Sequence, residues 1–286
     1  MSGVNFSIVA NSEFSDFINR FGIGKENEAI LYGSGDDTIN CVKRLSTMKV
    51  SGKYTFNQDR VTSLSLKSDK QFIINDERYG IIDTKVFGKI LKLNKKDYWF
   101  LIKTDETTTK IFIISENKVS EVPLSTFVDD KLKPVSFRET VFEKELSNEI
   151  LSDINDDCKA IDGQFFYLGF KKQQEKESYK TYLILGEKKW YRTETDIDVE
   201  LDKDKMNKLA EGCTSQAYFK ENSDGYEYIL RYNKDDLKSI LSVISTKNVD
   251  KIEAFLNFKG GLIFKEQSIL EHGSVEIDYG IRPVAV

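Results

Sequence analysis

The sequence predicts an α+β fold of two similar domains, in which antiparallel sheets carry helices on one face. Three observations predict it. The order of predicted elements repeats in the two halves of the 286-residue chain, two prolines bracket a segment of little periodicity between the halves, and the helices are too few to cover both faces of large sheets. Aromatic residues make up 12% of the chain and mostly alternate with polar residues, as they do in half-buried strands.

The first domain is predicted over residues 1–116. A strand at 5–9 precedes a helix at 12–21, whose apolar residues recur with helical spacing. A second helix is predicted around residues 85–96, because its apolar residues follow the same spacing. Alternating patterns predict the other strands of this half, at 29–32, 38–45, 53–56, 62–66, 71–74, 98–103 and 110–114.

The connector is predicted over residues 117–136, since Pro123 and Pro134 bracket residues 124–133. The second domain, residues 137–286, repeats the order of elements. Helices are predicted at 145–154 and 235–244, with strands at 165–170, 179–185, 190–193, 217–220, 226–232, 252–258, 262–264 and 274–279. Two short sequence similarities between the halves favour a duplication. Glu13-Phe-Ser-Asp is similar to Glu145-Leu-Ser-Asn, and Lys89-Ile-Leu is similar to Ser239-Ile-Leu.

A lysine stripe is the most informative local feature. The spacing places four ammonium groups on one face of the second predicted helix, opposite an apolar face that packs on a sheet. The stripe consists of Lys85, Lys89, Lys92 and Lys96. Lysine faces on surface helices are usually only solvated, and a contact with phosphates is the functional alternative.

The chain resembles a known family in three stretches. They are Gln71-Phe-Ile-Ile-Asn followed by Asp83-Thr-Lys-Val-Phe-Gly-Lys-Ile-Leu-Lys-Leu, Tyr226-Glu-Tyr-Ile-Leu-Arg-Tyr followed by Asp235-Asp-Leu-Lys-Ser-Ile-Leu, and Gly261-Leu-Ile-Phe-Lys-Glu. The order of elements around them resembles DNA sliding clamps, the polymerase processivity factors of the PCNA and phage clamp type. The resemblance implies that three two-domain subunits close a ring, whose helices line the central hole and hold duplex DNA through its phosphates.

The resemblance assigns DNA binding to the lysine stripe, and also to Arg20 and Lys238, which flank the exposed faces of the predicted helices at 12–21 and 235–244. The other helices fit less well, because they present Asp16, Glu149 and Asp156 among their exposed residues. Three possibilities stay open. The second domain holds DNA loosely, loops such as Lys171-Lys172 and Lys188-Lys189 compensate, or the protein is clamp-shaped and does not encircle DNA.

The resemblance also implies a docking pocket for partner peptides beside the connector and the C-terminal strands. Apolar side chains on a connector usually persist only when something covers them, and packing onto their own domain is the alternative. The candidate partner-binding residues are Val122, Leu124, Phe127, Val128, Ile281 and Pro283.

Composition limits the function classes. A net charge of -5 argues against a protein that coats nucleic acid nonspecifically. Three widely spaced cysteines argue against a disulfide framework or a zinc site and favour a reducing environment. The N-terminus shows no signal segment, and no apolar run is long enough to cross a bilayer. We therefore expect a soluble intracellular protein, in the host cytoplasm if the source is viral.

No catalytic site, metal site or cofactor is predicted. The lone histidine, His272, has no nucleophile or acid–base partner nearby, and the acidic clusters lack calcium-loop spacing. The predicted function is a non-enzymatic homotrimeric sliding clamp of phage or viral type, which encircles duplex DNA and binds a DNA polymerase and a clamp loader. The alternatives are a β-rich structural or assembly protein of a virion and a monomeric clamp-like polymerase accessory factor.

Overall fold

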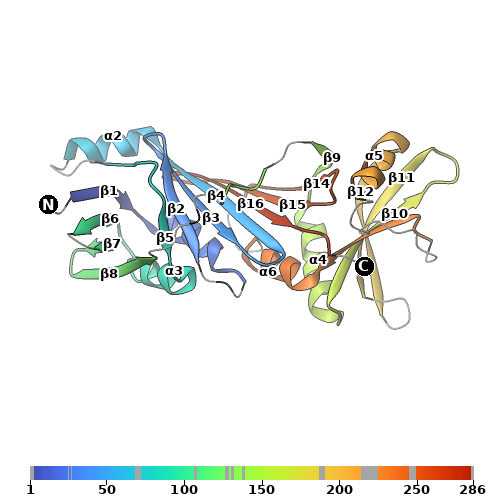
Figure 1. Ribbon diagram of the computed structural model, residues 1–286, viewed down its shortest axis with the longest axis horizontal. Coiled ribbons are helices and arrows are strands. Elements are labelled where there is room, and N and C mark those ends of the chain that lie inside the picture. Colours follow the sequence, from blue (N-terminus) through green and yellow to red (C-terminus); the bar gives the residue numbers. More distant parts are fainter. Residues whose placement is uncertain are drawn as a thin grey trace. The chain divides into compact units, whose positions relative to one another are not determined.

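The computed structural model describes residues 3–24, 26, 28–67, 72–105, 108–125, 129, 132–136, 139–186, 191–213, 225–244 and 249–284. The chain forms two compact units (Figure 1). Unit 1 comprises Met1–Leu45, Val50–Pro134 and Gln267–Ile277, and unit 2 comprises Ser46–Lys49, Val135–Glu266 and Asp278–Val286. No described helix is long and apolar enough to span a membrane.

Unit 1 is built from two consecutive β-α-β-β-β segments. The first contains β1 (Gly3–Ala10), α1 (Ser12–Asn19), the 3-10 helix η1 (Arg20–Gly22), β2 (Ala29–Ser34), β3 (Thr38–Arg44) and β4 (Met48–Phe56). The second contains β5 (Tyr79–Ile81), α3 (Thr84–Lys92), β6 (Tyr98–Asp105), β7 (Thr108–Ser115) and β8 (Lys118–Ser125). An additional helix, α2 (Gln58–Lys67), lies between the two segments.

The strands of unit 1 follow the order β1-β6-β7-β8-β5-β2-β3-β4. The pairs β1–β6, β6–β7 and β7–β8 are antiparallel, as are β2–β3 and β2–β5. The short strand β5 joins the two groups, because it pairs with β2 on one side and with Leu124 and Ser125 of β8 on the other. The first and second segments therefore share one sheet.

An aromatic cluster fixes α1 on this sheet. The ring of Phe14 lies edge-on to those of Tyr54 and Phe100, with centroids 5.8 and 5.6 Å apart. Phe17 lies 5.4 Å from Phe21 in the same way, and all five rings are buried. Because such pairs contribute about 0.5–1.5 kcal/mol beyond burial of area, the cluster holds one face of α1 against β4 and β6 and leaves the other face to solvent.

Unit 2 repeats the plan of unit 1. Its first segment contains β9 (Thr140–Glu145), α4 (Asn148–Ala160), β10 (Phe165–Lys172), β11 (Ser178–Gly186) and β12 (Arg192–Asp202). Its second contains β13 (Tyr228–Asn233), α6 (Lys234–Ile244), β14 (Lys251–Asn257), β15 (Leu262–Ile269) and β16 (Gly273–Ile281), and α5 (Lys203–Cys213) lies between the two segments. Residues 267–277 of β15, β16 and their turn count with unit 1. The strand orders are β12-β11-β10-β13 and β16-β15-β14-β9, so the predicted internal duplication is present in the order of elements.

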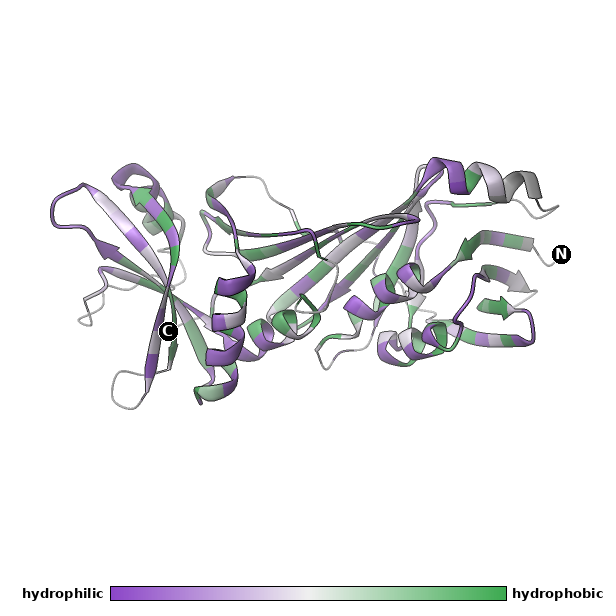
Figure 2. Cartoon of the chain, turned by 180° about the vertical axis from the view of Figure 1, so that it is seen from behind, coloured by the Kyte–Doolittle hydropathy of each residue, from purple (hydrophilic) through white to green (hydrophobic). Residues whose placement is uncertain are grey.

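Every helix of the repeated segments is amphipathic, as Figure 2 shows by the alternation of hydrophilic and hydrophobic stretches along each. In α6 the buried apolar residues recur at positions 237, 240, 241 and 244. In α4 the buried residues are Leu151, Ile154 and Cys158. This spacing is what a helix needs in order to pack on a sheet with one face and present its other face to solvent.

Some sequence-based boundaries were wrong. Residues 62–66, predicted as a strand, belong to α2, whose first turn is closed by hydrogen bonds from the backbone N–H groups of Arg60 and Val61 to the carbonyl of Asn57. Helix α3 ends at Lys92 instead of near residue 96. Helix α5 and strand β9 were not predicted, and β12 is longer than the predicted 190–193. The strand predicted at 217–220 lies outside the described residues.

The predicted connector begins inside unit 1. Residues 118–125 form β8, which pairs with β7 along its length and with β5 at its end. The compact units also differ from a division of the chain at one point, because residues 46–49 belong to unit 2 and residues 267–277 belong to unit 1. The domain boundaries at 116 and 137 stay a prediction.

Candidate nucleic-acid interface

Helices α1 and α3 of unit 1 pack side by side. Gly88 of α3 permits this approach, because a Cβ atom at that position would lie 2.3 Å from Asn19 Oδ1 of α1. Asn19 is itself held by donating Nδ2 to the carbonyl of Ser15, at 2.6 Å. The two helices thus form one continuous surface on the sheet.

The start of α3 is fixed by its cap. Asp83 Oδ1 accepts from the backbone N–H groups of Lys85 and Val86, each at 2.9 Å, which satisfies two of the free donors at the helix N-terminus. Phe87 and Leu91 are buried against the sheet. The positions of Lys85, Lys89 and Lys92 are then determined, and all three are exposed.

The lysine stripe is partly engaged within unit 1. Lys85 donates Nζ to the carbonyl of Gly24 at 2.7 Å, and Lys92 Nζ lies 3.3 Å from Asp16 Oδ1 on α1. These contacts link α3 to the neighbouring loop and helix, and the side chains stay largely open to solvent. Both ammonium groups can therefore contact a polyanion only if they share or release these partners.

Lys96 does not lie on the helix. It follows the end of α3 by four residues and pairs with Glu116 across 3.4 Å, with both side chains more than 70% exposed. The predicted stripe therefore contains three helical lysines and one loop lysine. Arg20 lies in η1, next to the end of α1.

A buried lysine that the sequence analysis did not single out supports this surface. Lys43 of β3 is fully buried and donates Nζ to the carbonyls of Phe21 and Ile23, at 2.8 and 2.7 Å, and to Thr84 Oγ1 at 3.2 Å. Burial lowers its pKa to about 8. Lys43 joins η1 to the first residue of α3. A lysine within a strand of buried apolar residues was the only sequence signal for it.

Helices α4 and α6 of unit 2 lack a basic face like that of α3. The exposed residues of α4 include Glu149, Asp153 and Asp156, and its Lys159 pairs with Asp156 at 3.2 Å. Lys238 is exposed on α6, where Asp235 is also exposed. Helices α4 and α6 contact each other. The acidic character expected from the sequence is therefore present on the solvent face of α4, whereas the exposed charges of α6 balance.

The outer lysines of unit 2 are paired with an acidic strand. Carboxylates alternate along the exposed face of β12 and form ion pairs with lysines of β9, β10, β11 and the β10–β11 turn. The pairs are Glu194 with Lys171 at 2.8 Å, Asp196 with Lys180 at 3.4 Å, Asp198 with Lys144 at 2.5 Å and Glu200 with Lys176 at 3.8 Å. Lys171 is thus engaged and Lys172 exposed. Lys188 and Lys189 lie outside the described residues.

Two pockets of unit 1 lie beside the end of β8. The larger, of about 920 Å³, is lined by Leu124 together with Arg78, Lys110 and neighbouring residues. The smaller, of about 170 Å³, is lined by Asp129 and Leu132 of the predicted connector. Gly80 and Ser125 line both. One predicted partner-binding residue, Leu124, therefore lines a surface pocket.

Arg78 ties the connector to these pockets. It donates Nη1 to the carbonyl of Asp129 at 3.2 Å and Nη2 to that of Leu132 at 2.9 Å. Its guanidinium lies 4.8 Å from the centroid of the Tyr32 ring. The fork of donors on Arg78 holds the described part of the connector against unit 1.

The other predicted partner-binding residues are distributed over the two units. Val122 is half-buried on β8, whereas Ile281 and Pro283 are buried within unit 2. The segment that carries them is held there, because the N–H of Val284 donates to the carbonyl of Arg231 at 2.8 Å. Phe127 and Val128 lie outside the described residues.

Comparison with solved structures finds similarity along the whole chain. One match is the PCNA2–PCNA3 complex from Sulfolobus tokodaii, with a TM-score of 0.57, 14% identity and 100% of both chains covered. Another is A. fulgidus PCNA bound to the C-terminal region of FEN-1, with a TM-score of 0.61, 10% identity and 98% of both chains covered. A third is the H. pylori beta clamp, with a TM-score of 0.63, 13% identity, and 99% of this chain but 67% of that chain covered.

No protein-family model and no curated protein sequence matches the chain. The similarity to solved structures nevertheless extends over both units and all the repeated segments, and it agrees with the resemblance inferred from the sequence. The chain therefore has the fold of the DNA sliding clamps.

Proposed function

We propose that this protein is a sliding clamp that encircles duplex DNA and tethers a DNA polymerase to its template. The observation that carries the proposal is the exposed lysine face of α3 on a chain that matches PCNA over its full length. Helix α3 would hold the phosphate backbone without reading bases, so that the protein could slide. It would need no chemistry of its own.

Closure of the ring would convert this weak contact into long residence. The described part of the chain offers an edge for assembly, because β12 pairs on one side with β11 and is the last strand of its sheet. An unpaired strand edge presents N–H and C=O groups that another subunit can pair with. We infer a homotrimer. The chain covers the whole of a PCNA subunit but only about two thirds of the longer beta clamp, so it corresponds to a two-domain subunit, and three such subunits would close the ring.

The proposed partners are the polymerase and a clamp loader. The pockets at Leu124 and Leu132 would receive their peptides, and docking would raise the effective concentration of polymerase at the template. We also propose that the protein comes from a phage or a virus and acts in the host cytoplasm.

The first test is assembly and topology. Sedimentation equilibrium should give about three times the 32.9 kDa subunit mass. Loaded protein should remain on nicked circular DNA and be lost when the circle is cut, because a ring slides off a free end. Equal retention on circular and linear DNA would contradict encirclement.

The second test is the lysine face. The triple variant Lys85→Glu, Lys89→Glu and Lys92→Glu should lose retention on circular DNA. The matched control changes three exposed lysines of unit 2, Lys205, Lys208 and Lys259, to Glu and makes the same change in net charge. Retention should survive in the control, because its lysines lie on α5 and on the turn between β14 and β15. Equal losses in the two variants would remove α3 from the mechanism.

A monomeric accessory factor that holds DNA on one basic face is the second candidate. The acidic solvent face of α4 favours it, since it repels phosphate and leaves α3 of unit 1 as the basic surface. A strict monomer at high concentration that binds short linear duplex would support this candidate over the ring.

A further inference from the structure

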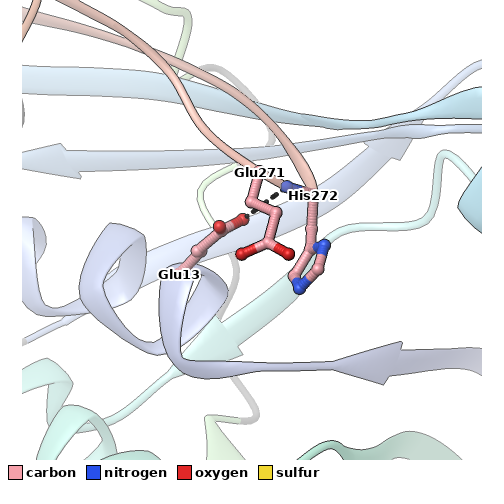
Figure 3. A group of neighbouring side chains, drawn as sticks. All are labelled: Glu13, Glu271 and His272. Atoms are coloured by element: carbon pink, nitrogen blue, oxygen red, sulfur yellow. Dashed lines mark hydrogen bonds between the residues drawn. The ribbon is translucent and has the colours of Figure 1, made fainter.

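Three metal-ligating side chains converge at one place in unit 1. Glu13 comes from the first turn of α1, and Glu271 and His272 come from the turn between β15 and β16. One ligand atom from each lies within 4.8 Å of the other two. In the view of Figure 3, the carboxylate of Glu271 lies between that of Glu13 and the imidazole ring of His272.

The backbone that carries Glu271 and His272 is held from one side. Asn57 donates its backbone N–H to the carbonyl of His272 at 3.1 Å and its Nδ2 to the carbonyl of Glu271 at 3.0 Å. Gly273 brings the turn close to β4, because a Cβ atom there would lie 2.4 Å from the carbonyl oxygen of Thr55. The turn is therefore fixed in place, and the two side chains reach α1 from a defined position.

Glu13 is oriented by hydrogen bonds that a metal ligand would use. Its Oε2 accepts from the hydroxyl of Tyr54 at 3.0 Å and from the backbone N–H of His272 at 3.2 Å. Both contacts engage the same oxygen, which leaves Oε1 for coordination. Hydrogen bonds of this kind fix the direction of carboxylate ligands and are a regular part of metal sites.

We propose that Glu13, Glu271 and His272 bind a divalent transition-metal ion of the Zn²⁺ class, which joins the first turn of α1 to the β15–β16 turn. The proposal is independent of DNA binding. The set combines one imidazole nitrogen with two carboxylates, both ligand types that Zn²⁺ accepts, and a three-ligand site keeps water in the fourth position.

The geometry needs only a small adjustment. Bonds of about 2.0–2.2 Å in a tetrahedral site place ligand atoms roughly 3.4 Å apart. In the structure the three ligand atoms lie within 4.8 Å of one another, so they need to move closer together. Glu271 is exposed and can close the gap by rotating its side chain, whereas Glu13 and His272 are half-buried. The ion would thus bind between two fixed ligands and one adjustable ligand.

Competition from thiols is weak. Cys41, Cys158 and Cys213 are all buried, and burial raises the pKa of Cys158 and of Cys213 to about 11. Because the thiolate is the form that binds metal, these side chains are poor ligands at neutral pH. His272 is the single histidine of the chain, so every imidazole signal reports on this site.

The test is titration of the full-length protein with Zn²⁺ and Co²⁺. We expect one Zn²⁺ per chain by calorimetry and a shift of the single set of imidazole NMR resonances at saturation. Co²⁺ should give visible d–d absorption without a thiolate charge-transfer band. The variants His272→Gln and Glu271→Gln should each weaken Zn²⁺ binding at least tenfold. Adding Zn²⁺ should raise the thermal midpoint of unfolding in wild type and leave it unchanged in both variants.

The matched control is Glu116→Gln, which removes an exposed carboxylate elsewhere in unit 1 and should leave Zn²⁺ affinity unchanged. Glu271 is exposed, so Glu271→Gln keeps the test valid even if the variant at His272 fails to fold. Equal affinity in wild type and Glu271→Gln, a thiolate band with Co²⁺, or unmoved imidazole resonances at saturating Zn²⁺ would each overturn the proposal.

Discussion

Asp16 of α1 lies 3.3 Å from the ammonium group of Lys92 on α3, with both side chains more than half exposed. The pair reduces the positive charge of the surface proposed to hold DNA. Asp16→Asn should therefore slow dissociation from DNA, by about 1.4- to 5-fold, since exposed ion pairs are worth about 0.2–1 kcal/mol. Dissociation rates on circular DNA at several salt concentrations measure the effect.

The control for this prediction is Asp156→Asn on α4, which also removes one negative charge next to a lysine. If unit 1 supplies the main contact, Asp156→Asn should change dissociation less than Asp16→Asn does. The reverse order would mean that unit 2 contributes more to DNA binding than its charge indicates.

Lys43 gives stability a specific pH dependence. Its folded pKa of about 8 is lower than its ordinary value, so between pH 8 and about 10.4 the unfolded chain binds more protons than the folded chain. The free energy of unfolding should therefore rise with pH in this window, by at most about 1.4 kcal/mol per pH unit. Urea unfolding at pH 7.5, 8.5 and 9.5 measures the slope.

Lys43→Met should flatten that slope, because the titrating group is gone. The exposed Lys205→Met is the matched control and should keep the wild-type slope. A slope that persists unchanged in Lys43→Met would show that another group titrates in this window.

The sequence was informative wherever apolar periodicity was strong. The pattern around Phe87 and Leu91 predicted α3, and the repeated order of elements predicted the duplication. It misled at residues 62–66, where apolar and polar residues alternate as in a strand but the chain continues the helix α2 that begins at Gln58. Local pattern also could not show that Lys92 would meet Asp16, or that Glu13 would meet His272, because those contacts depend on how distant segments pack.

Buried tyrosines predict a loss of stability at high pH. Burial raises the pKa of Tyr54, Tyr98 and Tyr232, and in Tyr54 the nearby Glu13 carboxylate adds to the effect. Below pH 10 these phenols are protonated in both states and have no effect. Above it the unfolded chain loses their protons first, so unfolding becomes more favourable as pH rises.

Circular dichroism from pH 9 to 12, with phenolate absorbance recorded in parallel, checks this prediction. Ionisation of the buried tyrosines should coincide with unfolding. Complete phenolate formation in a protein that stays folded would contradict the assignment of these side chains to the core.

Arg78 is predicted to hold the connector in place. Its two hydrogen bonds reach the carbonyls of Asp129 and Leu132, and the N–H of Leu132 donates to Asp129 at 3.0 Å. Arg78→Ala should speed hydrogen exchange at the Leu132 amide at least tenfold while exchange in β6 stays unchanged. Arg78→Lys should give an intermediate rate, because lysine keeps the charge and lacks the planar fork of donors. If Arg78→Ala leaves exchange at Leu132 unchanged, the connector is held by other contacts, and a polymerase-derived peptide should bind the variant as tightly as it binds wild type.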